Sequence, residues 1–239
     1  MQLLDLTLPT AAENLALDEA LLEEAESAAR AVETLRFWEP AEPLVVVGRS
    51  SHIASEVRVD ACRNLGIPVL RRISGGAAVV TGPGCLMYAV ILERRLHGEL
   101  RMIDRAHRFV LGTLAAAMKG LVPGVRCHGI SDLAIDGRKF SGNSLRCRRN
   151  YLLYHGTLLY EFPLELIEQC LAMPPRQPAY RAGRTHAAFV TNLPLPAAAI
   201  RRAIAAAWNA GDPLDDWPRE LTSRLAAEKY RQPSWNWQF

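Results

Sequence analysis

Two long segments of the chain repeat apolar residues at helical spacing. The first begins at Thr10, and the glutamate three residues later predicts a helix-capping box. Its apolar positions predict a helix to about residue 29: Leu15, Leu17, Ala20, Leu21 and Ala25. The second segment has apolar residues at Ile103, Ala106, Val110, Leu114, Met118 and Leu121. Because this period gathers apolar side chains on one face, we expect the second helix to pack against a sheet.

Strands are predicted where β-branched and apolar residues form short runs. These runs are residues 35–38, 44–48, 68–72, 86–92 and 151–159. The run 86–92 is apolar without interruption, which is typical of a central strand buried on both faces. Asp136-Gly137, between the runs 132–135 and 138–142, is the strongest short hairpin signal in the chain.

The order of these elements indicates the fold class. A short helix is expected at 60–65, and beyond residue 162 the pattern becomes helical and is interrupted by prolines. Strands and helices do not alternate regularly, which disfavours a doubly wound parallel sheet. We therefore predict an α+β fold in which helices flank a mixed, largely antiparallel sheet.

Composition excludes several classes of protein. The 239 residues suffice for a large core, and 49% apolar with 22% charged residues is ordinary for a globular protein. A formal charge of +3 argues against nucleic acid as a partner. No apolar run reaches membrane-spanning length and no leader pattern is visible, so a cytoplasmic location without membrane contact is expected. The five cysteines include no Cys-x-x-Cys pair, which argues against a disulfide framework or a zinc site.

The stretch 71–84 carries the main chemical signal. Arg71 and Arg72 suit a carboxylate or phosphate, and Gly75 and Gly76 let the main chain approach an anion closely. A second group of polar and glycine residues follows about sixty positions on, within residues 132–159. The two groups together predict a binding site for an acidic small molecule.

The stretch 67–76, Ile-Pro-Val-Leu-Arg-Arg-Ile-Ser-Gly-Gly, resembles the arginine–glycine motif of the lipoate–protein ligase and octanoyltransferase family, which is related to the biotin–protein ligases. Residues 138–143 and 155–159 are similar to its lysine motif and following strand. The resemblance implies the class II synthetase-like catalytic domain over residues 1–195. We expect residues 196–239 to be a helical extension that packs on the same domain.

The resemblance also implies roles for individual residues. Lys139 would be catalytic, pointing at the acyl carbonyl and stabilising the oxyanion formed when a lysine amine attacks. Asp132 and Arg146 would lie near the nucleotide. The remaining implied contacts are with the acyl substrate: Arg71, Arg72, Gly75, Gly76, Ala77, Gly142, Asn143, His155 and Gly156. Of the two adjacent arginines, strand alternation leaves one to contact ligand, and the resemblance favours Arg71. No metal ligands are predicted.

The implied activity joins lipoate or octanoate to a lysine through acyl-AMP, with ATP and Mg²⁺ as substrates. The acceptor would be an acidic lipoyl domain of the glycine cleavage H protein or dehydrogenase E2 type. Burying about eight carbons at roughly 0.8 kcal/mol each contributes some 6 kcal/mol, so contacts at the carboxyl end must add to the affinity.

Two other activities remain open from the sequence. Cys127, five residues before Asp132, is a candidate nucleophile for an ATP-independent transferase working through a thioester. A non-catalytic lipoyl-binding subunit is the third interpretation. It is favoured by Ala77 and Thr81, which stand where related ligases often have glycine and histidine.

Overall fold

The computed structural model describes residues 1–27 and 32–239. Helix α1 (Ala11–Glu26) begins as predicted, since the Thr10 side chain accepts from the Glu13 main chain and the Glu13 carboxylate accepts from Thr10. The helix ends at Glu26, and Ser27 is its C-cap. The predicted continuation to residue 29 lies outside the described residues.

Within the described residues, eight strands form the main sheet in the order β11-β1-β2-β6-β10-β9-β8-β7. Their bounds are β1 Gln2–Asp5, β2 Thr34–Trp38, β6 Cys85–Glu93, β7 Arg126–His128, β8 Asp132–Ile135, β9 Arg138–Cys147, β10 Tyr151–Leu159 and β11 Asp212–Pro213. Strand β1 is parallel to β2 and β11, and the pairings from β2 to β7 are antiparallel. The predicted mixed, largely antiparallel sheet is therefore confirmed.

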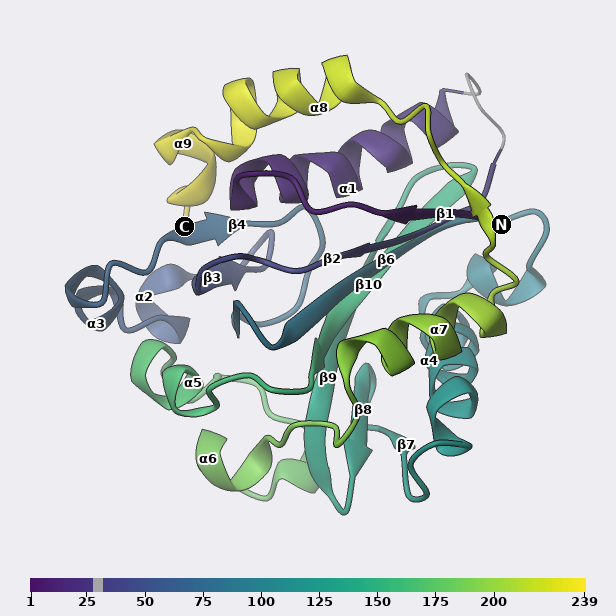
Figure 1. The fold of residues 1–239 in the computed structure, drawn as a ribbon. Coiled ribbons are helices and arrows are strands. Elements are labelled where there is room, and N and C mark those ends of the chain that lie inside the picture. The colour runs from purple at the N-terminus through teal and green to yellow at the C-terminus, as the bar shows by residue number, and fades with distance from the viewer. Residues whose placement is uncertain (28–31) are drawn as a thin grey trace.

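Helices cover both faces of this sheet (Figure 1). Helix α1 lies on one face together with α8 (Arg219–Leu225), and α4 (Ile103–Lys119) lies on the other with α7 (Ala197–Ala207). Along β6, Ala89 and Ile91 join the core beneath α1, whereas Tyr88 and Val90 join the core beneath α4. Successive side chains of a strand point to opposite faces. The uninterrupted apolar run thus belongs to a central strand, as predicted.

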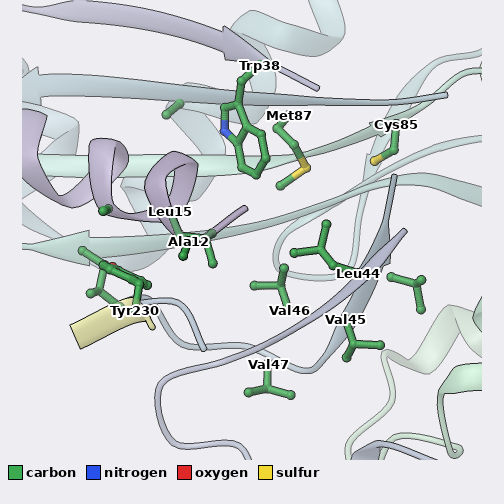
Figure 2. Close-up of a cluster of buried hydrophobic side chains, with 14 of the residues drawn as sticks. Ala12, Leu15, Trp38, Leu44, Val45, Val46, Val47, Cys85, Met87 and Tyr230 are labelled. Carbon is green, nitrogen blue, oxygen red and sulfur yellow. The ribbon is translucent and has the colours of Figure 1, made fainter. Parts of the chain in front are cut away.

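A second sheet of three strands packs under the N-terminal half of α1. It has the order β4-β3-β5, with β3 Leu44–Val47, β4 Val69–Arg71 and β5 Val79–Thr81. Figure 2 shows Val46 of β3 and Met87 of β6 reaching the same apolar cluster as Leu15 of α1. This small sheet carries the glycine-rich bend between β4 and β5, so the cluster positions the bend relative to the main sheet.

The β8–β9 hairpin forms where Asp136-Gly137 predicts it. Asp136 has φ 50° and Gly137 has φ 71°, and two successive left-handed residues make the turn that matches the twist of a hairpin. An irregularity in the pairing at Leu133 and Ala134 then shifts the register, so that Lys139 lies opposite Ala134. This hairpin carries Asp132 and Lys139 into neighbouring strands.

Shorter helices complete the molecule around the edges of the two sheets. They are α2 Ile53–Glu56, α3 Val59–Asn64, η1 Gly98–Arg101, α5 Glu165–Cys170, η2 Ala179–Arg181, α6 His186–Phe189, the π-helical turn η3 Ala226–Tyr230 and α9 Pro233–Asn236. The described residues include no helix that is both long and apolar enough to cross a bilayer.

Candidate functional site

A cavity of about 1030 Å³ opens between the two sheets. Its walls come from α1, the loop after β3, the glycine bend, β9, β10 and the segment 171–190. Small-molecule sites typically have volumes of about 300–1,000 Å³, so this cavity has room for more than an eight-carbon chain. The glycines of the arginine–glycine motif and Lys139 of the hairpin line this one space.

The glycine bend, residues 72–78 between β4 and β5, is held in place by hydrogen bonds to its own carbonyl groups. Ser51 Oγ donates to the Gly76 carbonyl at 3.1 Å, and Ser144 Oγ donates to the Gly75 carbonyl at 2.9 Å. Gly76 has φ +86°, which favours glycine. A Cβ on Gly48 would lie 2.0 Å from the Gly76 oxygen, so the absence of a side chain there permits the close approach.

Arg72, rather than Arg71, lines the cavity. Its guanidinium donates to the carbonyl oxygens of Val46 (3.0 Å), Gly75 (2.5 Å) and Ala77 (3.0 Å). Burial lowers the pKa of Arg72 to about 10. The Arg72 guanidinium thus donates to main-chain carbonyl groups and to Ser74 Oγ, and these hydrogen bonds stabilise the conformation of the bend.

Arg71 points to the other side of β4 and is fully buried outside the cavity. Its guanidinium donates to main-chain oxygens of Gly48, Arg49, Ser51, Trp235 and Asn236. The expectation that Arg71 contacts ligand therefore finds no support in its position. As strand alternation predicts, the two arginine side chains point to opposite sides of β4. Which of them faces the cavity depends on the packing of α9 against β4, and the sequence of the strand does not reveal that packing.

Lys139 forms the charged end of the cavity. Its Nζ lies 2.7 Å from Asp132 Oδ1, and the phenol of Tyr180 donates to Asp132 Oδ2 at 2.8 Å. The Lys139 side chain passes directly over Gly142. A Cβ at Gly142 would lie only 2.9 Å from Lys139 Nζ, so a side chain there would collide with the ammonium group. The ammonium group is thus held over the main chain of β9 while 27% of the side chain remains exposed.

Gly156 and Asn143 fit together across β9 and β10, where they are register partners. A Cβ on Gly156 would lie 2.0 Å from Asn143 Oδ1. This oxygen accepts from the Tyr88 hydroxyl at 2.5 Å, and Asn143 Nδ2 donates to the Ser131 carbonyl at 2.8 Å. Asn143 therefore ties the loop before β8 to the two central strands.

His155 belongs to a buried polar chain at the cavity wall. Its Nε2 lies 2.6 Å from Ser74 Oγ and its Nδ1 lies 3.1 Å from Asp18 Oδ2. Asp18 is also paired with Arg36 at 2.5 Å. Burial would raise the pKa of Asp18, but the Arg36 charge and hydrogen bonds from His155 and Arg36 hold it below its usual value.

Two further predicted residues, besides Arg71, do not line the cavity. Arg146 lies on β9 near Arg49 and Arg148, and burial together with these like charges lowers its pKa. Cys127 lies on β7 and is exposed as a residue. Its thiol is nevertheless partly desolvated, which raises the thiol pKa. A nucleophilic cysteine needs the opposite, a lowered thiol pKa. No cysteine is found among the described residues that line the cavity.

The structure adds residues that the sequence did not indicate. Tyr180 and Arg181 lie in the short helical turn η2, but the sequence around them has no helical or strand period that would mark them. Glu56 accepts from the Ala78 main chain at 2.6 Å and lines the cavity from α2. Within the described part of the chain, no three histidine, cysteine or carboxylate side chains gather as a metal site.

A family model described as the lipoyl protein ligase A/B catalytic domain matches residues 10–201. The chain belongs to this family. A putative lipoate-protein ligase A of Aeropyrum pernix is 35% identical over 146 residues, covering 61% of this chain and 52% of that protein. An octanoyltransferase, LipM, of Symbiobacterium thermophilum is 28% identical and covers 94% of this chain and 93% of that protein.

The fold is also that of solved family members. A putative lipoate protein ligase of Thermoplasma acidophilum with bound lipoic acid superposes with a TM-score of 0.82 at 20% identity, covering 99% of this chain and 98% of that one. By contrast, this chain spans about half the length of the ligase sequences it matches, with 52% of the Aeropyrum pernix protein and 42% of a Mycoplasma pneumoniae one.

Proposed function

We propose that this protein joins lipoate or octanoate to a lysine of an acceptor protein through an acyl-adenylate. The observation that carries the proposal is the position of Lys139, whose Nζ lies in the same cavity as the glycine bend. Sequence relatives named lipoate-protein ligases and octanoyltransferases support an acyl-transfer role.

The acyl chain would occupy the apolar part of the cavity. Leucine, valine and methionine side chains from α1, β3, β5, β6 and β10 line it: Leu15, Val46, Val80, Met87 and Leu159. The carboxyl head would then lie toward Lys139 and the glycine bend. An apolar slot with polar groups at one end is typical of a site that orients an amphipathic ligand.

The first step would use ATP carried with Mg²⁺. A carboxylate oxygen of the acid attacks the α-phosphorus, a new P–O bond forms, and pyrophosphate leaves. A solved ligase of the same fold is described as bound with ATP, which supports this substrate. Mg²⁺ is usually held by substrate phosphates and one or two carboxylates, and Asp132 is a carboxylate in this part of the cavity.

The second step transfers the acyl group. The acceptor amine attacks the acyl carbon, an amide bond forms, AMP leaves with the former carboxylate oxygen, and the amine proton passes to solvent. Lys139 would stabilise the negative charge that develops on the carbonyl oxygen. Asp132 and Tyr180 would hold Lys139 for this role, because Lys139 is paired with the same carboxylate that Tyr180 binds.

The acceptor would be a lipoyl domain of the E2 or glycine cleavage H type. A bi-partite lipoate protein ligase of Thermoplasma acidophilum with this fold is described together with its E2 lipoyl domain. Another relative is named an octanoyl-[GcvH]:protein N-octanoyltransferase, a name in which the H protein carries the acyl group. We place the catalytic unit at residues 1–195, with 196–239 as its helical extension; α7 and α8 of that extension pack against α4 and α1. A cytoplasmic location stays a prediction.

The direct test incubates the purified protein with lipoate or octanoate, Mg-ATP and a lipoyl domain, and measures the acceptor mass. A gain of one acyl group that requires ATP supports the ligase. A gain only from an octanoyl-carrier donor, without ATP, supports a transferase instead. No gain from any donor would refute both activities and favour the lipoyl-binding subunit.

An ATP-independent octanoyltransferase is the second candidate. It is favoured by the extent of the match to the LipM octanoyltransferase of Symbiobacterium thermophilum, which covers 94% of this chain and 93% of that protein. A thioester on Cys127 is disfavoured by the exposed position of that thiol outside the cavity. The donor requirement in the mass assay separates the two candidates.

A further inference from the structure

Side chains of helix α9 complete the edge of the small sheet. Strand β4 is an edge strand, because the sheet has the order β4-β3-β5. On its open side, the Arg71 amide donates to Asn236 Oδ1 at 2.9 Å, and Trp235 Nε1 donates to the Arg71 carbonyl at 2.9 Å. Asn236 is 5% exposed, and its Nδ2 donates to the Tyr230 carbonyl at 2.9 Å. Helix α9 thus satisfies main-chain groups that an edge strand otherwise leaves open.

The same helix binds the guanidinium group of Arg71. Its Nε and Nη2 donate to the Asn236 carbonyl at 3.3 and 3.1 Å. Its Nη1 donates to the carbonyl oxygens of Gly48 at 2.7 Å and Ser51 at 2.9 Å. Arg71 is 0% exposed, so these carbonyl groups replace the water that the charge loses on burial. One buried side chain therefore joins α9 to the loop 48–51 after β3.

That loop in turn contacts the glycine bend at two points. The Arg49 amide donates to the Ser74 carbonyl at 2.8 Å, and Ser51 Oγ donates to the Gly76 carbonyl at 3.1 Å. Ser51 also lines the cavity. A continuous path of hydrogen bonds therefore runs from α9 through Arg71 and the loop to the bend.

We propose that Trp235 and Asn236 are positioning residues of the acyl site, which keep the glycine bend in the conformation that binds the acid. The inference rests on the proposed function. It places part of the site beyond residue 201, where the match to the family model ends. Neither residue lines the cavity, so neither contacts the acid. They act by preorganisation, because a bend already held in its binding conformation loses less entropy when the acid binds.

The test compares Asn236→Leu with Asn236→Asp in the full chain. Leucine is similar in size but cannot accept from the Arg71 amide, whereas aspartate keeps that acceptor. In calorimetric titration, Asn236→Leu should weaken octanoate binding about tenfold, the order expected for one buried hydrogen bond. Asn236→Asp should bind octanoate more tightly than Asn236→Leu. In acceptor acylation, Asn236→Leu should raise the KM for octanoate and keep kcat near the wild-type value, because Lys139 is unchanged.

The matched control is Thr222→Val, which also removes one buried hydrogen bond without a change of size. The Thr222 hydroxyl donates to the Pro218 carbonyl at 2.7 Å, and the residue is 2% exposed in α8. Both Thr222→Val and Asn236→Leu should lower the melting temperature, but only Asn236→Leu should weaken octanoate binding. Equal weakening by the two variants, or wild-type affinity in Asn236→Leu, would overturn the proposal.

A milder pair of variants covers the case in which Asn236→Leu does not fold. Trp235→Phe removes the indole donor to the Arg71 carbonyl. Trp237→Phe makes the same change two residues on, at a side chain that is 49% exposed. Weaker octanoate binding in Trp235→Phe alone supports the positioning role, and equal affinity of the two variants contradicts it.

Amide hydrogen exchange of the ligand-free protein, measured by NMR, separates the positioning role from the proposed function. The Arg49 amide donates to the Ser74 carbonyl and the Ala78 amide donates to Glu56, so neither hydrogen bond involves Asn236. If α9 holds the bend, both amides should exchange faster in Asn236→Leu than in Thr222→Val. Unchanged exchange, in a protein that acylates the acceptor, refutes the positioning role and leaves the ligase intact. Faster exchange, in a protein whose wild type acylates no acceptor, supports the link from α9 to the bend and refutes the proposed function.

Discussion

Replacing Asp18 by asparagine should strongly destabilise the protein. Asp18 and Arg36 are paired at 2.5 Å, and their side chains are 4% and 0% exposed. Arg36 also donates to the Asn14 carbonyl at 2.8 Å and to Asn14 Oδ1 at 2.7 Å, but these neutral acceptors do not balance its charge. Removing one partner of a buried ion pair costs about 3–5 kcal/mol, out of a total of about 5–15 kcal/mol for a domain.

The pH dependence follows from the direction of the Asp18 pKa. The folded-state pKa lies below the unfolded value of 3.8, so the pair contributes its full stability above about pH 4. The contribution is lost as pH falls below 3.8 toward the folded-state pKa. Asp18→Asn has no such titration, and the stability difference between it and the wild type should therefore narrow in this acid range.

Urea unfolding followed by circular dichroism measures both effects. The matched variants are Arg36→Met and the double variant with Asp18→Asn, because replacing a whole buried pair by less polar groups is often nearly neutral. We expect the double variant to lose less than the sum of the single losses. A cost below about 1 kcal/mol for Asp18→Asn at pH 7, well under the range for broken buried pairs, would refute the reasoning.

Three further substitutions test the site. Lys139→Gln should lower kcat by about 10²–10³-fold, the usual loss for one oxyanion donor, measured as acceptor acylation at saturating substrate. Cys127→Ser should keep full activity, because the thiol is exposed outside the cavity. Gly48→Ala should weaken octanoate binding in calorimetry and cost about 1–3 kcal/mol of stability, since its Cβ would lie 2.0 Å from the Gly76 oxygen.

Two of these changes have matched control variants. Lys119→Gln alters the same charge at the end of α4 and should leave acylation unchanged. Gly112→Ala, mid-helix in α4 with nothing within 4 Å of its Cβ, should stabilise the protein by about 0.5–1 kcal/mol. Wild-type turnover in Lys139→Gln would contradict the oxyanion role. A tenfold loss in Cys127→Ser would restore the thioester route, and unchanged octanoate binding in Gly48→Ala would show that the bend tolerates a shift.

The arrangement of the fold was largely predictable because its signals are local. Three such signals are the capping box at Thr10, the apolar run of β6 and the Asp136-Gly137 turn. Each depends on the backbone preferences of neighbouring residues, and the folded structure has the predicted element at each place. Helix α4 follows from its stripe of apolar residues in the same way. The family resemblance added the identity of the cavity residues on the glycine bend and the β9 strand.

Tertiary packing decided what those signals leave open. Alternation along β4 separates Arg71 from Arg72, but only the docking of α9 turns Arg71 toward main-chain carbonyls and leaves Arg72 to the cavity. Tyr180 stands in a segment whose sequence has no helical or strand period, and its hydrogen bond to Asp132 joins residues far apart in the chain. Local sequence determines which segments become helices, strands and turns. The partners of a charged side chain depend instead on how segments distant in the sequence pack together.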